Sequence, residues 1–334
     1  MTVEVEDLMV PVSLAADVTV KDVERAAERL RGHATRTPLL RQDLLGSGLA
    51  EGVFLKPENL QRTGSFKFRG AYNTLASFTP SERRRGVVTS SSGNHGQAVA
   101  AAAQILDMKA CVVMPEHAVQ VKVDAVRSYG ARVVFAGTTS PEREATAQEI
   151  GRREGAVVIG SFDDARIIAG QGTAGLEIAE DLPDADIVLS PVGGGGLISG
   201  VALAIKAKRP TACVFGVEPS GAADAAESLR TGKIVTLGTI DTIADGLRTS
   251  RVGNLNFGIM SRLLDGIVTV SDGEIREAMR DLAFKSKLTV EPSGAVAVAA
   301  LLTGRIQVGG AKVVVLISGG NVDPSMYREI LAGS

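Results

Sequence analysis

The sequence predicts an α/β protein with parallel sheets that carry helices on both faces, and three observations point to this fold class. From about residue 86, short apolar segments alternate with longer segments of helical periodicity, as in parallel strands joined by helical crossovers. Gly86, Gly130 and Gly155 each mark a junction between such segments. A chain of 334 residues can also bury a large core, in one large or two smaller domains.

The N-terminal part is expected to begin with an amphipathic helix. Thr19 can cap a helix over about 21–31, whose apolar residues fall on one face. Pro38 disfavours helix before it, so the segment around it is expected to be extended. A short strand over 53–56 and a helix over 71–78 follow.

The remaining elements alternate along the chain. Strands are expected at 87–89, 110–114, 132–135, 157–159, 187–190, 213–217, 267–270 and 313–317. Helices are expected at 94–106, 120–129, 141–154, 172–180, 197–207, 274–285 and 294–302. The block 77–163 is predicted to form a smaller domain, inserted between the two parts, 1–76 and 164–334, of a larger one.

Composition argues against nucleic acid and membrane as partners. Lys plus Arg is 36 and Asp plus Glu is 38, which leaves a net charge of −2, and aromatic residues make up 4%; a nucleic-acid-binding protein would show a basic stripe. No apolar run reaches the length of a membrane span. The acidic start, 1–7, is unlike a signal peptide, which predicts a cytoplasmic protein. Cys111 and Cys213 lie in apolar runs, are expected to be core thiols, and provide neither a disulfide framework nor metal-ligand spacing.

Lys67 is the first candidate for chemistry. It lies in a small, polar, glycine-containing turn, 63–70, beside a predicted helix. Neighbouring N–H groups and a dry pocket can keep its amine partly neutral, and a neutral amine forms a Schiff base with an aldehyde. The alternative is an ordinary solvated lysine.

A glycine-rich loop, 190–197, follows a predicted strand and opens a helix. Its four glycines let the backbone approach a ligand closely, and the helix dipole adds positive potential, which suits a phosphate. The loop matches neither the dinucleotide-binding fingerprint nor a Walker A loop. The alternative is a packed glycine turn.

Three further stretches follow the ends of predicted strands. Ser90–His95 offers hydroxyl, amide and N–H groups that can receive a carboxylate. The alternative is that this stretch only caps a helix. Ser318 opens a Gly-Gly turn, and its hydroxyl can meet a ring nitrogen beyond the strand end. Glu218 and Asp224, with a carbonyl between them, can form an all-oxygen cation site, or else are two solvated acids.

Together these stretches resemble the fold-type II pyridoxal-phosphate enzymes, which have the tryptophan synthase β-like fold. The resemblance is closest to the serine/threonine dehydratases and serine racemases, and it covers about 20–325. The motifs that carry it are Gly64–Gly70, Ser91–Gln97, Ala169–Thr173, Pro191–Gly196, Ile243–Gly246 and Ser318–Asp323. It implies that the larger domain binds the cofactor and the smaller one the substrate.

The resemblance also implies a role for each matching residue. Lys67 is expected to form the Schiff base with pyridoxal 5'-phosphate, and the other cofactor contacts are assigned to Phe66 on the ring face, Asn94 on the 3-oxygen, Ser318 on the ring nitrogen, and Gly193, Gly194, Gly195, Gly196 and Leu197 on the phosphate. The residues expected to contact the substrate are Ser91, Ser92, Asn94, His95 and Arg143. The divalent cation, Mg²⁺, Ca²⁺ or Mn²⁺, is assigned to Glu218, the carbonyl of Ala222, and Asp224.

The implied reaction is α,β-elimination of L-threonine or L-serine to a 2-oxo acid and ammonia, with Lys67 as general base. A serine at the ring nitrogen is expected to leave that nitrogen unprotonated, which favours elimination over formation of a full carbanion. Ser92 supports a first alternative, a serine racemase in which Lys67 and Ser92 act on opposite faces. A threo-3-hydroxyaspartate dehydratase is a second alternative, because the segment 248–257 departs from the family pattern.

Two further properties follow from the same family. Its members are commonly dimers, so a homodimer is expected. Lys287 and Asn321 match part of the nucleotide site of the racemases. A cofactor-binding protein that has lost catalysis is a third alternative, but the lysine, the glycine loop and Ser318 are all present.

Overall fold

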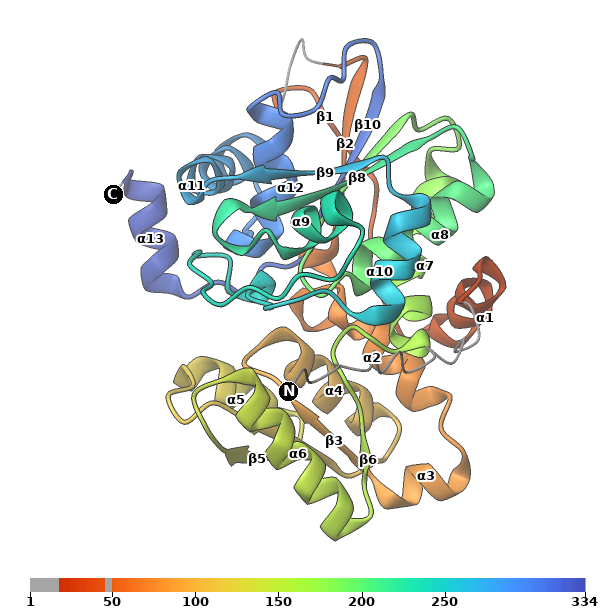
Figure 1. The fold of residues 1–334 in the computed structure, drawn as a ribbon, viewed down its shortest axis with the longest axis vertical. Helices are drawn as coiled ribbons and strands as arrows, with labels where there is room; N and C mark the ends of the chain where they lie inside the picture. The colour runs from red at the N-terminus through yellow and green to blue at the C-terminus, as the bar shows by residue number, and fades with distance from the viewer. Residues whose placement is uncertain (1–17, 46–49, 334) are drawn as a thin grey trace, which may run out of the picture.

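The computed structural model describes residues 18–45 and 50–333. The acidic start on which the prediction of no signal peptide rests lies outside these ranges. The strands form two sheets, one above the other in Figure 1. The larger sheet has the order β1-β2-β10-β7-β8-β9, and the smaller has the order β5-β4-β3-β6. The prediction of an α/β fold is confirmed.

Strands β2 to β10 lie where the apolar runs predicted them, to within one or two residues at their ends, whereas β1 was not predicted as a strand. Their bounds are β1 Leu40–Gln42, β2 Gly52–Pro57, β3 Val87–Ser90, β4 Ala110–Met114, β5 Arg132–Phe135, β6 Val157–Val158, β7 Ile187–Pro191, β8 Cys213–Pro219, β9 Gly266–Val270 and β10 Lys312–Ile317. Every pairing is parallel except that of β1 with β2. This antiparallel edge is a departure from an all-parallel sheet.

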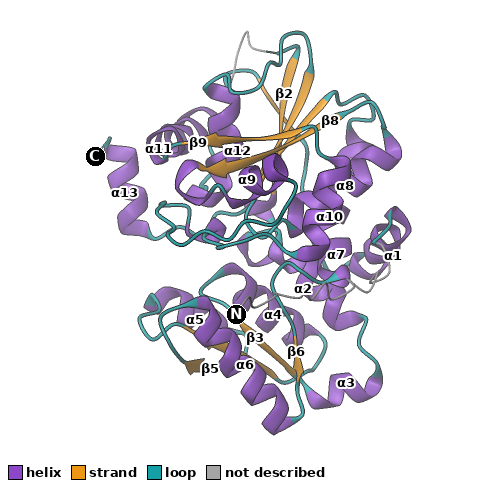
Figure 2. Cartoon of the chain, in the orientation of Figure 1, coloured by secondary structure: helices purple, strands orange, loops and turns teal. Residues whose placement is uncertain are grey.

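The helices cover both faces of the sheets (Figure 2). Their bounds are α1 Val20–Leu30, α2 Lys67–Ala76, α3 Pro80–Arg85, α4 Asn94–Ile105, α5 Gln120–Ser128, α6 Ser140–Glu154, α7 Ala165–Asp181, α8 Gly196–Lys208, α9 Asp224–Thr231, α10 Asn254–Leu263, α11 Asp272–Asp281, α12 Pro292–Leu302 and α13 Pro324–Ala332. A π-helical turn, η5, spans Leu282–Ser286 and replaces the end of the helix predicted at 274–285. Among the helices of the described ranges, none is long and apolar enough to cross a bilayer, and the cytoplasmic location stays a prediction.

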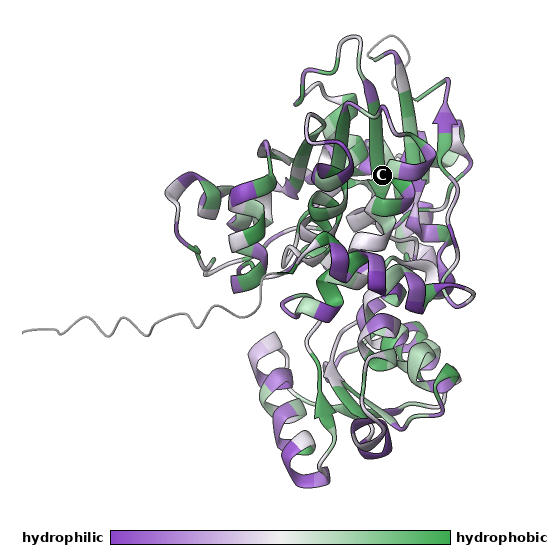
Figure 3. Ribbon diagram, turned by 90° about the vertical axis from the view of Figure 1, so that its right-hand side faces the viewer, coloured by the Kyte–Doolittle hydropathy of each residue, from purple (hydrophilic) through white to green (hydrophobic). Residues whose placement is uncertain are grey.

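The larger sheet is buried on both faces, which explains the unbroken apolar run of β10. Val313, Val315 and Ile317 pack with α11 and α12 on one face. Val314 and Leu316 pack with α7 and α8 on the other. Side chains of a strand alternate between faces, so a strand covered on both sides must be apolar throughout. Figure 3 shows the same arrangement, with apolar strands inside and hydrophilic residues on the outer helices.

The smaller sheet repeats this pattern around β4. Val112 and Met114 pack with residues of α4 and α5, whereas Cys111 and Val113 pack with α6. Cys111 is buried as expected. Cys213 is only half-buried, because it is the first residue of β8. Both thiols are free. Strands β3 to β6 all lie within the predicted smaller domain, whose boundaries at 77 and 163 stay a prediction.

Helix α7 begins seven residues earlier than the predicted 172–180, and the reason is tertiary. Asp164 caps it by accepting the N–H of Arg166 at 2.7 Å. A Cβ on Gly170 would lie 2.6 Å from the Cα of Gly70, and one on Gly172 would lie 2.7 Å from the carbonyl oxygen of Gly200. The glycines that weaken the helical pattern are therefore the ones that let α7 contact α2 and α8 closely.

Candidate active site

A cavity of about 1010 Å³ lies between the two sheets. It is lined by the ends of β3, β7 and β10, as expected for parallel sheets, where ligands bind beyond the carboxyl ends of strands. Every residue predicted to contact cofactor or substrate lines it, although these residues are far apart in the chain. They are Phe66, Lys67, Ser91, Ser92, Asn94, His95, Arg143, Gly193, Gly194, Gly195, Gly196, Leu197 and Ser318.

Lys67 is the first residue of α2 and points into this cavity. Its Nζ donates to the carbonyl oxygen of Ser161 at 3.0 Å and lies 5.1 Å from the centre of the Phe66 ring. Burial lowers the pKa of the amine from 10.5 to about 8, because a charged ammonium loses hydration there. About a tenth of the amine is thus neutral at pH 7, far more than for an ordinary lysine, and able to act as a nucleophile or base.

The turn before Lys67 is held against the end of β10. The N–H of Phe66 donates to the carbonyl of Ser318 at 3.1 Å, and the N–H of Gly320 donates to the carbonyl of Gly64 at 2.9 Å. Thr63 adopts a left-handed conformation with φ of 66°, which is costly for a residue with a branched side chain. The structure therefore places the lysine and Ser318 in one rigid unit. The Ser318 hydroxyl is buried and donates to the carbonyl of Ser293 at 3.2 Å.

The glycine loop, residues 193–196, presents free N–H groups to the cavity. Within the described part of the chain, no acceptor receives the N–H groups of these four glycines. Gly195 has φ of +93°, which side-chain-bearing residues rarely adopt, and a Cβ on Gly194 would lie 2.3 Å from the ring of Phe162. The loop opens α8, so its donors coincide with the positive end of a helix dipole.

The serine loop, residues 90–95, divides its side chains between structure and cavity. The Ser91 hydroxyl accepts the N–H groups of Gly96 at 2.9 Å and Gly93 at 3.2 Å, and so caps α4. Ser92 is exposed to the cavity, and among the described residues it has no hydrogen-bond partner. His95 is buried, and neither ring nitrogen has a partner within 18–45 and 50–333. Burial lowers its pKa to about 3, so it is neutral.

Asn94 is oriented by two residues that sequence reasoning did not assign to it. Its Nδ2 donates to Glu291 at 2.7 Å, and its Oδ1 accepts from Asn321 at 2.9 Å. Glu291 is buried beside the cavity, and burial together with the nearby charge of Asp245 raises its pKa to about 7. The signal in the sequence was an acidic residue directly before Pro292 at a helix start.

Arg143 extends the cavity on the side of α6. Its guanidinium donates to the carbonyl of Thr138 at 3.2 Å and to Ser140 Oγ at 2.9 Å. The side chain is buried, desolvation lowers its pKa, and none of the described carboxylates forms an ion pair with it. Lys122 of α5 also lines the cavity, but it is already paired with Asp245. Arg143 is therefore a cation with room for an anionic partner.

Glu218 and Asp224 lie outside this cavity, at the end of β8 and the start of α9. Glu218 accepts the N–H groups of Ala225 at 3.0 Å and Ala226 at 2.8 Å. Both oxygens of Asp224 are buried, and neither has a hydrogen-bond partner among the residues that the structure describes. Burial raises the pKa of Glu218 to about 8, helped by the charge of Asp224, and raises that of Asp224 to about 7. Ala222, the predicted carbonyl ligand, lies between them in the chain and is the buried last residue of the 3-10 turn Ser220–Ala222.

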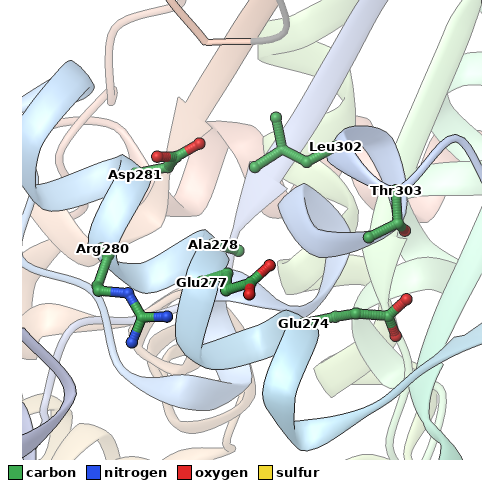
Figure 4. A pocket seen from close by; sticks show the side chains of 7 residues that line it. All are labelled: Glu274, Glu277, Ala278, Arg280, Asp281, Leu302 and Thr303. Atoms are coloured by element: carbon green, nitrogen blue, oxygen red, sulfur yellow. The ribbon is translucent and has the colours of Figure 1, made fainter. Parts of the chain in front are cut away.

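A second, smaller cavity of about 370 Å³ lies between α11 and α12 (Figure 4). Two of its three acidic residues already have partners: Glu274 accepts from Ser271 and Arg305, and Asp281 pairs with Lys285. It holds none of the predicted site residues. The larger cavity is therefore the candidate active site.

Comparison with known proteins gives this arrangement a family. A family described as "Pyridoxal-phosphate dependent enzyme" matches residues 30–319. The chain belongs to this family. It is 44% identical over 312 residues to an L-threo-3-hydroxyaspartate ammonia-lyase of a Pseudomonas species, covering 93% of this chain and 98% of that one. It is 40% identical over 314 residues to a serine racemase of Schizosaccharomyces pombe, covering 94% and 97%.

The fold is shared as well. The solved structure of a maize serine racemase superposes with a TM-score of 0.89 at 37% identity, covering 96% of this chain and 99% of that one. The recognition of the fold-type II family is therefore confirmed, and so is the prediction of a pyridoxal-phosphate-dependent enzyme of the ammonia-lyase and racemase group.

The residues present fit the cofactor of this family. The amine of Lys67 can bind the aldehyde of the cofactor, and the free N–H groups of 193–196 can bind its phosphate. The structure brings both to one cavity. The acid pair also fits a hard cation. Its two carboxylates are buried, and among the described residues Asp224 has no hydrogen-bond partner, so a bound cation can neutralise charge that would otherwise have to be removed by protonation. In the described ranges no cluster of three or more Asp, Glu, His or Cys side chains occurs, so a cation at Glu218 and Asp224 would rely on backbone carbonyls and water for its other ligands.

Proposed function

We propose that this chain catalyses α,β-elimination on a β-hydroxy amino acid, L-threonine or L-serine, to release a 2-oxo acid and ammonia. The observation that supports it most is a neutralisable lysine in the same cavity as a free phosphate-binding loop and a buried serine at a strand end. The bound cofactor would supply an electron-withdrawing ring that acidifies the α-hydrogen of the attached amino acid.

The side chains of this protein divide the remaining tasks. The neutral Nζ of Lys67 takes the proton from the α-carbon as general base. The serine loop, with its N–H groups at the start of α4, receives the substrate carboxylate. Ser318, a neutral hydroxyl, places no negative charge beside the ring. Glu291 and Asn321 keep the Asn94 amide in a fixed orientation toward the cavity.

Incubation with amino acids tests this proposal. L-Serine, L-threonine and L-threo-3-hydroxyaspartate are each mixed with the enzyme, pyridoxal phosphate and Mg²⁺, and both the 2-oxo acid and the D-enantiomer are quantified. Lys67→Ala is expected to abolish product, whereas Lys109→Ala, at an exposed lysine, leaves it unchanged. Full turnover by Lys67→Ala, or no oxo acid from any of the three substrates, would overturn the proposal.

Threo-3-hydroxyaspartate is a second candidate substrate, and Arg143 favours it. An unpaired buried guanidinium is suited to a second carboxylate, and the Pseudomonas relative is named for this substrate. Arg143→Met is expected to raise KM for 3-hydroxyaspartate at least about tenfold, with little effect on threonine. Arg152→Met, on the exposed side of the same helix, is the matched control. An equal loss for both substrates would instead assign Arg143 to the α-carboxylate.

Racemisation is a further candidate activity, and Ser92 is the residue that favours it. Its hydroxyl lines the cavity without a protein partner among the described residues, as a second proton carrier requires. Ser92→Ala is expected to lower D-serine formation while oxo-acid formation from L-serine continues. Unchanged D-serine formation would rule out Ser92 as that second carrier.

We also propose a homodimer, supported by three exposed apolar side chains, Leu44, Leu60 and Phe284, whose exposed fractions are 67%, 49% and 58%. Hydrogen bonds from Ser286 to Gln42 and from Asn59 to Thr289 hold these segments together. Grouped exposed apolar side chains are typical of protein interfaces. Phe284→Glu is expected to give monomers in sedimentation, and Phe135→Glu, at an exposed phenylalanine on β5, is the control. A wild-type monomer would refute this proposal.

A further inference from the structure

Asn256 lies on the first turn of α10, within the segment 248–257 that departs from the family pattern. It contacts the glycine loop at the carbonyl of Gly194. It is fully buried. Its Nδ2 donates to the carbonyl oxygen of Gly194 at 2.9 Å and to that of Phe162 at 3.1 Å. A side-chain amide has two N–H donors, so both are used on backbone carbonyls. One belongs to the glycine loop, and the other belongs to the connection between β6 and α7.

The surroundings of Asn256 make this contact a rigid one. The N–H of Gly253 also donates to the carbonyl of Gly194, at 3.1 Å. The carboxylate of Asp163 accepts the N–H groups of Asn254 at 2.8 Å and Leu255 at 3.0 Å, and so fixes the start of α10. The glycine loop is thus held between the Phe162 ring on one side and Asn256 on the other.

This anchoring decides where the next N–H group points. The peptide bonds of the described residues are all trans, and in a trans peptide unit the carbonyl and the following N–H point in opposite directions. With the Gly194 carbonyl held toward α10, the Gly195 N–H is directed away from α10, and it has no acceptor in the described part of the protein. The peptide between Gly194 and Gly195 therefore offers a donor, and not a carbonyl oxygen, to an anion.

Glycines on both sides make this orientation easy to lose. A peptide unit flanked by two glycines meets no Cβ barrier to rotation, so both of its orientations are accessible. A flipped unit would turn the Gly194 oxygen toward the phosphate and repel it. We propose that Asn256 is a positioning residue that keeps the glycine loop in its anion-binding orientation and so sets the affinity for the cofactor phosphate. This inference rests on cofactor binding at the loop, not on the identity of the substrate.

Binding of the cofactor with and without its phosphate tests the proposal. Apoenzyme is titrated with pyridoxal phosphate and with pyridoxal, and the visible absorbance of the lysine-bound aldehyde reports each dissociation constant. Asn256→Ala is expected to raise the constant for pyridoxal phosphate about tenfold or more, since it removes the side-chain hydrogen bonds to the buried carbonyl of Gly194 and the partly buried carbonyl of Phe162. The constant for pyridoxal should stay within about twofold, because pyridoxal makes no use of the loop.

Controls separate positioning from loss of structure. Ser261→Ala, on the exposed side of α10, removes only a bond to the carbonyl of Phe257 and should change neither constant. Asn256→Ser keeps one donor, should fall between wild type and Asn256→Ala, and decides the matter if the alanine variant does not fold. Equal weakening of both ligands, or a pyridoxal-phosphate constant within twofold of wild type, would overturn the proposal. Neither result depends on whether the enzyme turns over any amino acid.

Discussion

Replacing Asp224 by asparagine should stabilise this protein when divalent cations are removed. Glu218 and Asp224 are buried close enough for the charge of Asp224 to raise the pKa of Glu218, and both Asp224 oxygens lack a partner. Without a cation, ionising both acids places like charges in a poorly hydrated site. Asp224→Asn removes one charge and adds an amide that can donate to Glu218.

The magnitude follows from the pKa of Asp224, which burial raises from 3.8 to about 7. Each tenfold change in proton affinity is worth about 1.4 kcal/mol, so the upper limit is about 4 kcal/mol. Because the folded pKa is above the unfolded one, the folded state loses stability as pH rises from about 4 to about 7, and the loss is complete above that. Relaxation and water penetration reduce the effect, so we expect a gain of about 1–3 kcal/mol near pH 8.

Thermal unfolding in chelator and in excess Mg²⁺, Ca²⁺ or Mn²⁺ is the assay. For the wild type near pH 8, a cation at about 100 times its dissociation constant should add about 2.7 kcal/mol, a rise of several degrees in Tm. Asp224→Asn should be more stable than the wild type in chelator and should lose the response to cation. Glu227→Gln, on the exposed face of α9, should keep that response. A variant less stable than the wild type in chelator, or one that still responds to cation, would refute the reasoning.

Three other predictions concern Lys67, Arg69 and Glu291. With the Lys67 pKa at about 8, the stopped-flow rate at which apoenzyme binds pyridoxal phosphate should rise with pH. It should reach half its maximum near pH 8, where half of the amine is neutral, and level off about one pH unit higher. A rise continuing toward the ordinary lysine value of 10.5 would contradict this. Arg69→Ala removes the ion-pair partner of the buried Glu58 and leaves Glu177 paired with Lys56 alone. It should cost about 3–5 kcal/mol in urea unfolding, against less than about 1 kcal/mol for the exposed Arg25→Ala. Equal costs would show that the buried cluster is not stabilising. Glu291→Gln keeps an acceptor for Asn94 and should retain about a third or more of kcat/KM, while Glu291→Ala should retain about a tenth or less; equal activities would remove Glu291 from the orientation of Asn94.

The elements that follow local rules were predictable from the sequence. Both faces of the larger sheet are covered, so β10 had to be an apolar run and was visible as one. The errors occurred where long-range contact overrides local preference. Gly170 and Gly172 weakened the helical pattern of α7, yet they are required by its close packing on α2 and α8. The edge strand β1 pairs antiparallel with β2, and strand direction is a property of pairing that no single segment carries.

The sequence by itself determined the family, the cofactor and the segments that bear the chemistry, because Lys67, the glycine loop and Ser318 each lie in a short contiguous motif at a strand end. Tertiary structure decided what surrounds them. The roles of Glu291 and Asn256 come from contacts 197 and 62 positions away in the chain, and the pKa values of Lys67 and the acid pair come from burial. Hydration and partners depend on which distant segments pack together, so these properties exist only in the folded chain.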